Sequence, residues 1–178
     1  MRGSLHRFID RFRQAREGAT AVEFGIVALP FVVMMFAVFE LGLVFIIDSS
    51  LESAVIDSGR LVRTGQAQAS AMDRDGFKEA VCSRMTIFED SCNARLKVDV
   101  RTIVDFASPP PDPLADGEEF SEDGLGYDDG SARSLVVVSA WYSQPLFTPL
   151  LSDALSRLGD GTAWITATTA FRNEPFGA

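Results

Sequence analysis

The chain has 178 residues and a formal net charge of −9 at pH 7, a length that allows one domain with appendages. An acidic chain repels the nucleic-acid backbone, so DNA and RNA are excluded as expected partners. The charge is uneven, because residues 1–18 hold five arginines against Asp10 and Glu17, a net +3, and the remainder carries −12. A basic stretch ahead of an apolar run favours a cytoplasmic N-terminus, with the body of the chain across a membrane.

A long apolar run extends from Phe24 to Ile47. Its residues would span roughly 36 Å as a helix, more than the hydrocarbon core of about 30 Å. A buried core helix is disfavoured because such helices are rarely apolar on every side. A secretory signal peptide is disfavoured because its apolar stretch is only about 7–15 residues long. The run therefore predicts a helix that crosses a membrane once.

Helical periodicity continues beyond this run. Small and apolar side chains recur at three- and four-residue spacing, at Ile47, Leu51, Ala54, Val55, Ser58 and Val62. Charged residues fall on the other faces, and Gly65 is a plausible helix stop. We expect one helix from Ala19 to Thr64, whose first half lies in lipid and whose second half packs an apolar stripe on a soluble domain.

The remaining residues predict a small mixed domain. A helix over Arg74–Phe88, capped by Asp73 or Asp75, should turn Phe77, Val81 and Met85 inward. Alternating or β-branched sequences predict strands, and a Pro-led amphipathic segment predicts a short helix. The strands are expected over Leu96–Phe106, Ser134–Tyr142 and Gly161–Phe171, and the short helix over Thr148–Leu158. The expected fold is α+β, an arrangement in which the long N-terminal helix packs on a small antiparallel sheet with short helices.

An acidic segment, Ala107–Ser131, separates the first two expected strands. Proline, glycine and acidic residues dominate it, so we expect a mobile, exposed loop. A calcium site is the alternative, because Glu122, Asp123, Asp128 and Asp129 are close in sequence. Their spacing does not fit an EF-hand loop, which favours the solvated loop over the calcium site.

Two cysteines, Cys82 and Cys92, follow the expected membrane helix. In an oxidising compartment such a pair is expected to form one disulfide, whereas two buried free thiols are the alternative. The predicted topology places both cysteines outside the cytosol, which favours the disulfide.

The boundary between the basic leader and the apolar run carries a distinctive spacing. Cleavage between Gly18 and Ala19 would give Ala19 a free ammonium and would place Glu23 fifth in the new chain, followed by Phe24. This spacing resembles that of type IV prepilins and their relatives. The resemblance implies a prepilin peptidase that cuts after the glycine, and a Glu23 that pairs with the N-terminal amine of a neighbouring subunit. An uncleaved signal anchor, with Glu23 reaching the cytosolic headgroups, is the alternative.

Further motifs narrow the resemblance to the TadE-like family of the tight-adherence (Tad/Flp) pilus system. They are AVEFGIVALPF at 21–31, FELG at 39–42, SGRLVRTG at 58–65 and FRNEPF at 171–176. The family includes minor pilins, or pseudopilins, and TadE, TadF and TadG share the N-terminal pattern. The chain is also far longer than a major Flp pilin, which is little more than the helix, and this favours a minor component.

Glu40 lies within the apolar run. A carboxylate at membrane depth is costly unless it is paired, and FELG belongs to the resemblance. Contact with a partner helix is therefore favoured over a protonated Glu40 bonded within its own helix. We expect Glu23, Phe24 and Glu40 to take part in assembly.

Catalysis is not expected. The single histidine, His6, lies in the leader, so the processed chain would lack the His needed for Ser–His or Cys–His nucleophile pairs and for His-ligated zinc. The acidic residues cluster in a loop instead of an apolar pocket. We therefore expect no catalytic residues, no metal and no cofactor.

The expected organisation is a cytoplasmic leader at 1–18, a transmembrane and amphipathic helix at 19–65, and a periplasmic α+β domain at 66–178. The resemblance implies a minor pilin in the bacterial inner membrane or in the pilus itself. Its implied partners are the membrane, a prepilin peptidase, other Tad pilins and pilus assembly proteins. The alternative is an uncleaved, membrane-anchored periplasmic module that scaffolds a secretion complex.

Overall fold

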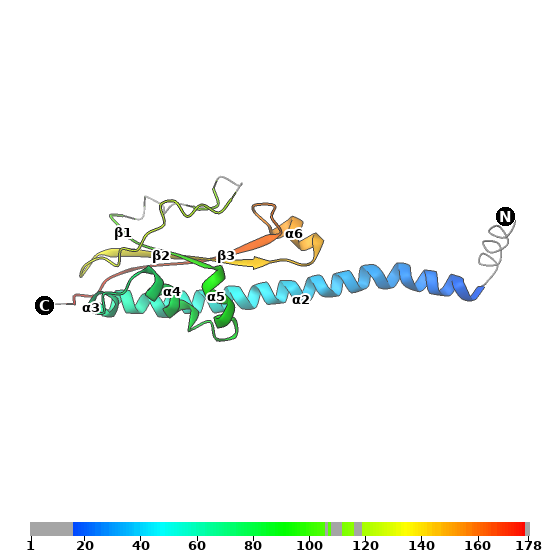
Figure 1. Cartoon of the computed structure of the whole chain (residues 1–178), viewed down its shortest axis with the longest axis horizontal. Helices are drawn as coiled ribbons and strands as arrows, with labels where there is room; N and C mark the ends of the chain where they lie inside the picture. Colours follow the sequence, from blue (N-terminus) through cyan, green and yellow to red (C-terminus); the bar gives the residue numbers. More distant parts are fainter. Residues whose placement is uncertain (1–15, 106, 108–111, 116–118, 177–178) are drawn as a thin grey trace. The chain divides into compact units, whose positions relative to one another are not determined.

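A computed structural model describes residues 16–105, 107, 112–115 and 119–176. Most of the expected leader, residues 1–15, lies outside the described residues. The chain divides into two units, one ending at Phe39 and the other beginning at Glu40. The elements, in chain order (Figure 1), are α2 (Arg16–Arg63), α3 (Gln66–Ala69), α4 (Arg74–Cys82), the 3-10 turn η1 (Thr86–Phe88), α5 (Glu89–Arg95), β1 (Leu96–Ile103), β2 (Leu135–Pro145), α6 (Pro149–Leu155) and β3 (Thr162–Arg172). The fold is α+β, as expected.

The unit that begins at Glu40 is a three-stranded antiparallel sheet in the order β1-β2-β3, with helices on one face (Figure 1). Residues 40–63 of α2 supply the predicted apolar stripe, and all six of its members are buried: Ile47, Leu51, Ala54, Val55, Ser58 and Val62. The stripe joins a hydrophobic core with side chains from α4, α5 and the inner face of the sheet. The 3.6-residue period of the sequence thus correctly located the helix face that packs on the domain.

The strands pair in a regular register, which runs from Leu96 opposite Tyr142 to Ile103 opposite Leu135. The strand expected to reach Phe106 therefore ends at Ile103, because the partner strand begins at Leu135. Val104, which follows the last strand residue, is 97% exposed.

The expectation of an exposed loop at 107–131 is wrong in part, because Pro113 and Leu114 are buried and Phe120 packs on the outer face of the sheet. It is confirmed for Asp112 and residues 122–124, which are exposed. Asp99, which lies between the inward-facing Val98 and Val100, has a side chain only 1% exposed and accepts two hydrogen bonds from Arg101 and one from the Gly126 amide at 2.7 Å. Phe120 stacks on Trp164, with ring centroids 4.3 Å apart. Residues 108–111 and 116–118 of this segment lie outside the described residues.

The helix that begins at Arg74 is shorter than expected. Asp73 caps it by accepting from the Gly76 amide, and Phe77, Val81 and Met85 are buried as predicted. It ends at Cys82 instead of Phe88, because the next amides, those of Arg84 and Met85, form tighter i→i+3 bonds. The chain then turns back into α5, where Cys92 forms a disulfide with Cys82. The sequence did not predict α3 or α5, which have only four and seven residues.

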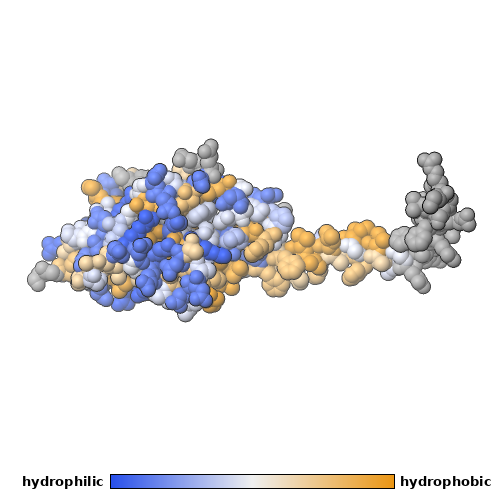
Figure 2. All heavy atoms as spheres, in the orientation of Figure 1, coloured by the Kyte–Doolittle hydropathy of each residue, from blue (hydrophilic) through white to orange (hydrophobic). Residues whose placement is uncertain are grey.

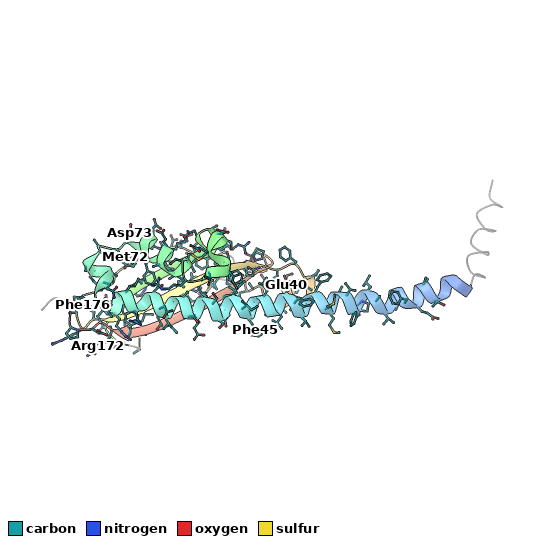
Figure 3. The ribbon with its side chains drawn as sticks, turned by 90° about the horizontal axis from the view of Figure 1, so that it is seen from below. Glu40, Phe45, Met72, Asp73, Arg172 and Phe176 are labelled. Carbon is teal, nitrogen blue, oxygen red and sulfur yellow. A yellow bond between two sulfur atoms is a disulfide. The ribbon has the colours of Figure 1, made fainter. Side chains whose placement is uncertain are left out.

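The sequence motifs at 58–65 and 171–176 meet in the fold, although more than 100 residues separate them. Gly59 lies so close to β3 that a Cβ atom there would be 2.9 Å from the Phe171 ring. Gly65 ends α2 with a φ of 81°, and a Cβ there would be 2.5 Å from the ring of Phe176 (Figure 3). The C-terminal segment therefore closes over the end of α2.

Hydrogen bonds fix this closure. The Glu174 amide donates to the carbonyl of Arg63 at 2.8 Å, and their side chains form an ion pair at 3.4 Å. The Asn173 side-chain amide donates to the carbonyls of Asp129 and Ser131 at 2.9 and 3.1 Å. One short segment thus joins the end of α2 to the connection that precedes β2.

We predict that Gly65→Ala lowers the free energy of unfolding by about 2–3 kcal/mol, because left-handed strain alone costs about 1–2 kcal/mol and the methyl group also meets the Phe176 ring. Gly159→Ala is the matched control, since Gly159 has a φ of 69° but a Cβ at this position would meet no atom within 4 Å. Denaturant titration of the detergent-solubilised full chain measures both variants. Equal losses would mean that the contact between Gly65 and Phe176 adds nothing.

Candidate functional site

The unit that ends at Phe39 presents a helix with apolar side chains on all sides. Ten large apolar side chains are each more than half exposed: Val22, Phe24, Ile26, Val27, Leu29, Phe31, Met34, Phe36, Val38 and Phe39. Figure 2 shows this concentration of apolar residues, which contrasts with the mostly hydrophilic surface of the globular unit. A continuous apolar surface of this kind indicates contact with lipid or with apolar partner surfaces. Among the described residues, one helix, Thr20–Arg63, is long and apolar enough to cross a membrane.

The residues of the expected processing site lie at the start of this helix. Gly18, Ala19 and Glu23 are all helical, and Glu23 is exposed. Positions 19 and 23 are separated by four residues, so they lie on the same face of α2. A Cβ at Gly18 would meet no atom within 4 Å, so packing in this fold does not require a glycine at that position.

Glu40 is the first residue of the globular unit and is only 9% exposed. Its carboxylate accepts hydrogen bonds from two consecutive backbone amides, those of Phe147 and, at 2.9 Å, Thr148 (Figure 3 labels Glu40 on α2). These amides follow the end of β2 at Pro145, where they have no strand partner to pair with. The carboxylate thus supplies the acceptors that the sheet no longer offers.

This contact was not foreseen in the sequence. The expected contact between Glu40 and a partner helix is not tested by a single chain, but both carboxylate oxygens already have partners within the chain. The interaction joins residues 107 and 108 positions apart. The sequence showed only that Glu40 is an acidic residue within the apolar run. It did not indicate which backbone amides would donate hydrogen bonds to Glu40.

The acidic residues proposed as calcium ligands make separate contacts. Glu122 pairs with Lys97, and Asp128 accepts a hydrogen bond from Thr102 at 2.5 Å. Burial raises the pKa of Asp129 above its ordinary value, and the nearby Asp128 adds to this shift. Within the described residues, no group of three or more acidic, His or Cys side chains could hold a metal ion.

We predict that Glu40→Ala lowers the free energy of unfolding by about 2–4 kcal/mol, because two amides lose hydrogen bonds to a charged acceptor. Glu40→Gln should cost roughly half as much, since one oxygen remains. Glu52→Ala, which removes an exposed carboxylate from the same helix, should stay within about 0.5 kcal/mol of the unmodified chain. The measurement is denaturation of the full chain in detergent, followed by tryptophan fluorescence. A Glu40→Ala variant as stable as Glu52→Ala would contradict the structural role.

Comparison with known proteins supports the resemblance seen in the motifs. Residues 18–60 match a family model described as TadE-like protein. No curated protein and no solved structure matches the chain. The matched segment begins at Gly18, contains Glu23 and Glu40, and ends just before the last turn of α2. Residues 18–60, most of the N-terminal helix, are therefore similar to TadE-like proteins, which supports the resemblance of the chain to the TadE-like family.

Proposed function

We propose that the chain is a minor pilin, or pseudopilin, of a Tad-type pilus, cut by a prepilin peptidase after Gly18 and assembled through its N-terminal helix. The observation that carries the proposal is the exposed apolar surface of α2 up to Phe39, which lies within the TadE-like segment. The proposed location is the bacterial inner membrane or the pilus, with the leader cytoplasmic and the globular unit periplasmic. The proposed role is structural, and its partners are other Tad pilins and pilus assembly proteins.

The electrostatics of the helix start support assembly after cleavage. Within residues 18–39, Glu23 is the only charged side chain, and it sits among exposed apolar residues such as Val22 and Phe24. A carboxylate in this setting costs about 2.5 kcal/mol or more in lipid unless it is paired. Cleavage would create an ammonium on Ala19, and a neighbouring subunit's Glu23 would neutralise it when the helices pack side by side. Phe24 would pack beside that pair.

The size of the globular unit supports a minor component. The described residues from Glu40 onward form a sheet with its own hydrophobic core, which adds much more than a helix to the assembly. Such a unit favours a minor subunit that starts or regulates the filament, because the major Flp pilin implied by the resemblance is little more than a helix.

Processing is the first testable consequence. We predict that the mature protein begins at Ala19, and that a bulky replacement such as Gly18→Trp blocks cleavage. Intact-mass measurement of protein purified from cells with an active prepilin peptidase decides this. Gly25→Trp is the matched control, because it places the same bulk on the same exposed helix, where a Cβ meets no atom within 4 Å. A full-length mass for the unmodified protein would favour the uncleaved anchor, which scaffolds a secretion complex instead.

Charge pairing at Glu23 is the second consequence. Glu23→Ala should leave insertion and cleavage intact but should reduce crosslinking to partner pilins about tenfold or more, since a lost pairing at membrane depth costs several kcal/mol. Glu23→Asp should be milder, because the charge survives while the reach shortens. Glu52→Ala serves as the control for loss of an exposed carboxylate on α2. Normal crosslinking and normal pilus counts with a cleaved Glu23→Ala protein would rule out this mechanism.

A further inference from the structure

The connection between β2 and α6 exposes an aromatic side chain without an evident structural use. Phe147 is 84% exposed, although its own backbone amide is held by Glu40. A polar residue would serve equally well to present that amide. The nearby part of α2 is also apolar on its surface, with Phe45 63% and Ile46 54% exposed.

The length of the exposed helix sets the position of Glu40. Residues 20–39 precede Glu40, and 20 residues extend about 30 Å as a helix, which equals the hydrocarbon thickness of a bilayer. A membrane span that begins at Thr20 would place Glu40 at the boundary between hydrocarbon and headgroups. The headgroup layer adds roughly 5–8 Å on each side, and Phe45 lies about 7.5 Å further along the helix than Glu40.

The hydrogen bonds of Glu40 bring Phe147 to the same level. Because the Phe147 amide is bonded to the Glu40 carboxylate, residue 147 lies beside α2 at the position of Glu40. Phe45, further along α2, projects from the side of the helix opposite Glu40 (Figure 3). No charged residue occurs between Glu40 and Asp48 or within 145–149.

We propose that these three side chains, Phe45, Ile46 and Phe147, form an interfacial rim through which the globular unit contacts the phospholipid bilayer. The inference rests on the membrane span of the proposed function. Continuity with the spanning helix, the helix length and the uncharged, aromatic character of the rim argue for lipid as the occupant. Aromatic and aliphatic side chains of this kind insert at the boundary between headgroups and acyl chains. Because the rim carries no cationic residue, the contact should depend little on anionic lipid or on salt.

The test uses single-cysteine variants of the full chain, labelled with the fluorophore NBD and reconstituted in phosphatidylcholine vesicles. With the Cys82–Cys92 disulfide intact, the introduced cysteine is the only reactive thiol. Phe147→Cys reports on the rim and keeps the backbone amide that Glu40 binds. Leu29→Cys reports on the spanning helix. Val104→Cys is the matched control, because the Val104 side chain is 97% exposed. Val104 follows Ile103, which pairs with Leu135 at the start of β2, whereas Phe147 follows the other end of β2, about 30 Å away.

The rim proposal predicts at least twofold higher NBD emission at position 147 than at 104, and quenching of the 147 probe by nitroxide at the lipid headgroup. This signal should not change with the protein-to-lipid ratio. If position 29 is shielded but position 147 behaves like 104, the rim proposal is overturned while the membrane span stands. If position 29 itself is accessible to water-soluble quencher, the span fails and the rim fails with it. A 147 signal that rises with protein density assigns the surface to a second copy and overturns lipid as the occupant.

Discussion

The helix α2 has two surface patterns in series, one apolar on all sides and one with a single apolar stripe. The rest of the structure depends on the residue at which the first pattern gives way to the second. From Val22 to Phe39, α2 has apolar or small residues on every side apart from Glu23, and most of its large apolar side chains are exposed. From Ile47 onward, only one stripe is apolar, and the sheet covers that stripe. Glu40 marks the change, because it is the first α2 carboxylate after Glu23 and it bonds to the globular unit. A helix with two patterns in series needs no linker between anchor and domain.

The close approach of α2 to the sheet explains why small residues interrupt its second half. Ser58 and Gly59 are both buried, and the missing side chain of Gly59 leaves room for the Phe171 ring of β3. Further along, the Phe176 ring occupies the space above Gly65. The motifs at 58–65 and 171–176 therefore describe the two sides of one contact. Their joint presence in the sequence reflects a packing requirement of the fold.

Patterns with a local cause were predicted well from the sequence. The stripe from Ile47 to Val62 follows from helical periodicity alone, and the Asp73 cap follows from the amides at the start of a helix. The spacing of Gly18 and Glu23, which resembles that of prepilins, was likewise recognisable in the sequence. The role of these residues in processing and assembly stays a prediction.

Features with a distant cause were missed. Asp99 alternates like a solvent-facing strand residue, yet the Gly126 amide and the side chain of Arg101 enclose its carboxylate. The partners of Glu40 lie more than 100 residues away, so no window of sequence contains both. The end of the helix at Cys82 depends on the turn that returns the chain to Cys92. For Asp99 and Glu40 the deciding contact was between distant segments, and the segments gave no sign of it separately.

The closure of the C-terminal segment over α2 has a consequence for the order of folding. The stripe of α2 is synthesised long before β3, yet Gly59 and Gly65 find their contacts only in residues 171 and 176. Contacts of such high sequence separation are slow to form, because a long loop has to close before they contribute any stability. Part of the apolar stripe therefore stays uncovered until the last strand joins the sheet. During that interval, the nascent domain exposes the hydrophobic surface of α2 and an unpaired edge on β2. A chaperone, or a β-strand of another chain, would compete with β3 for these two sites.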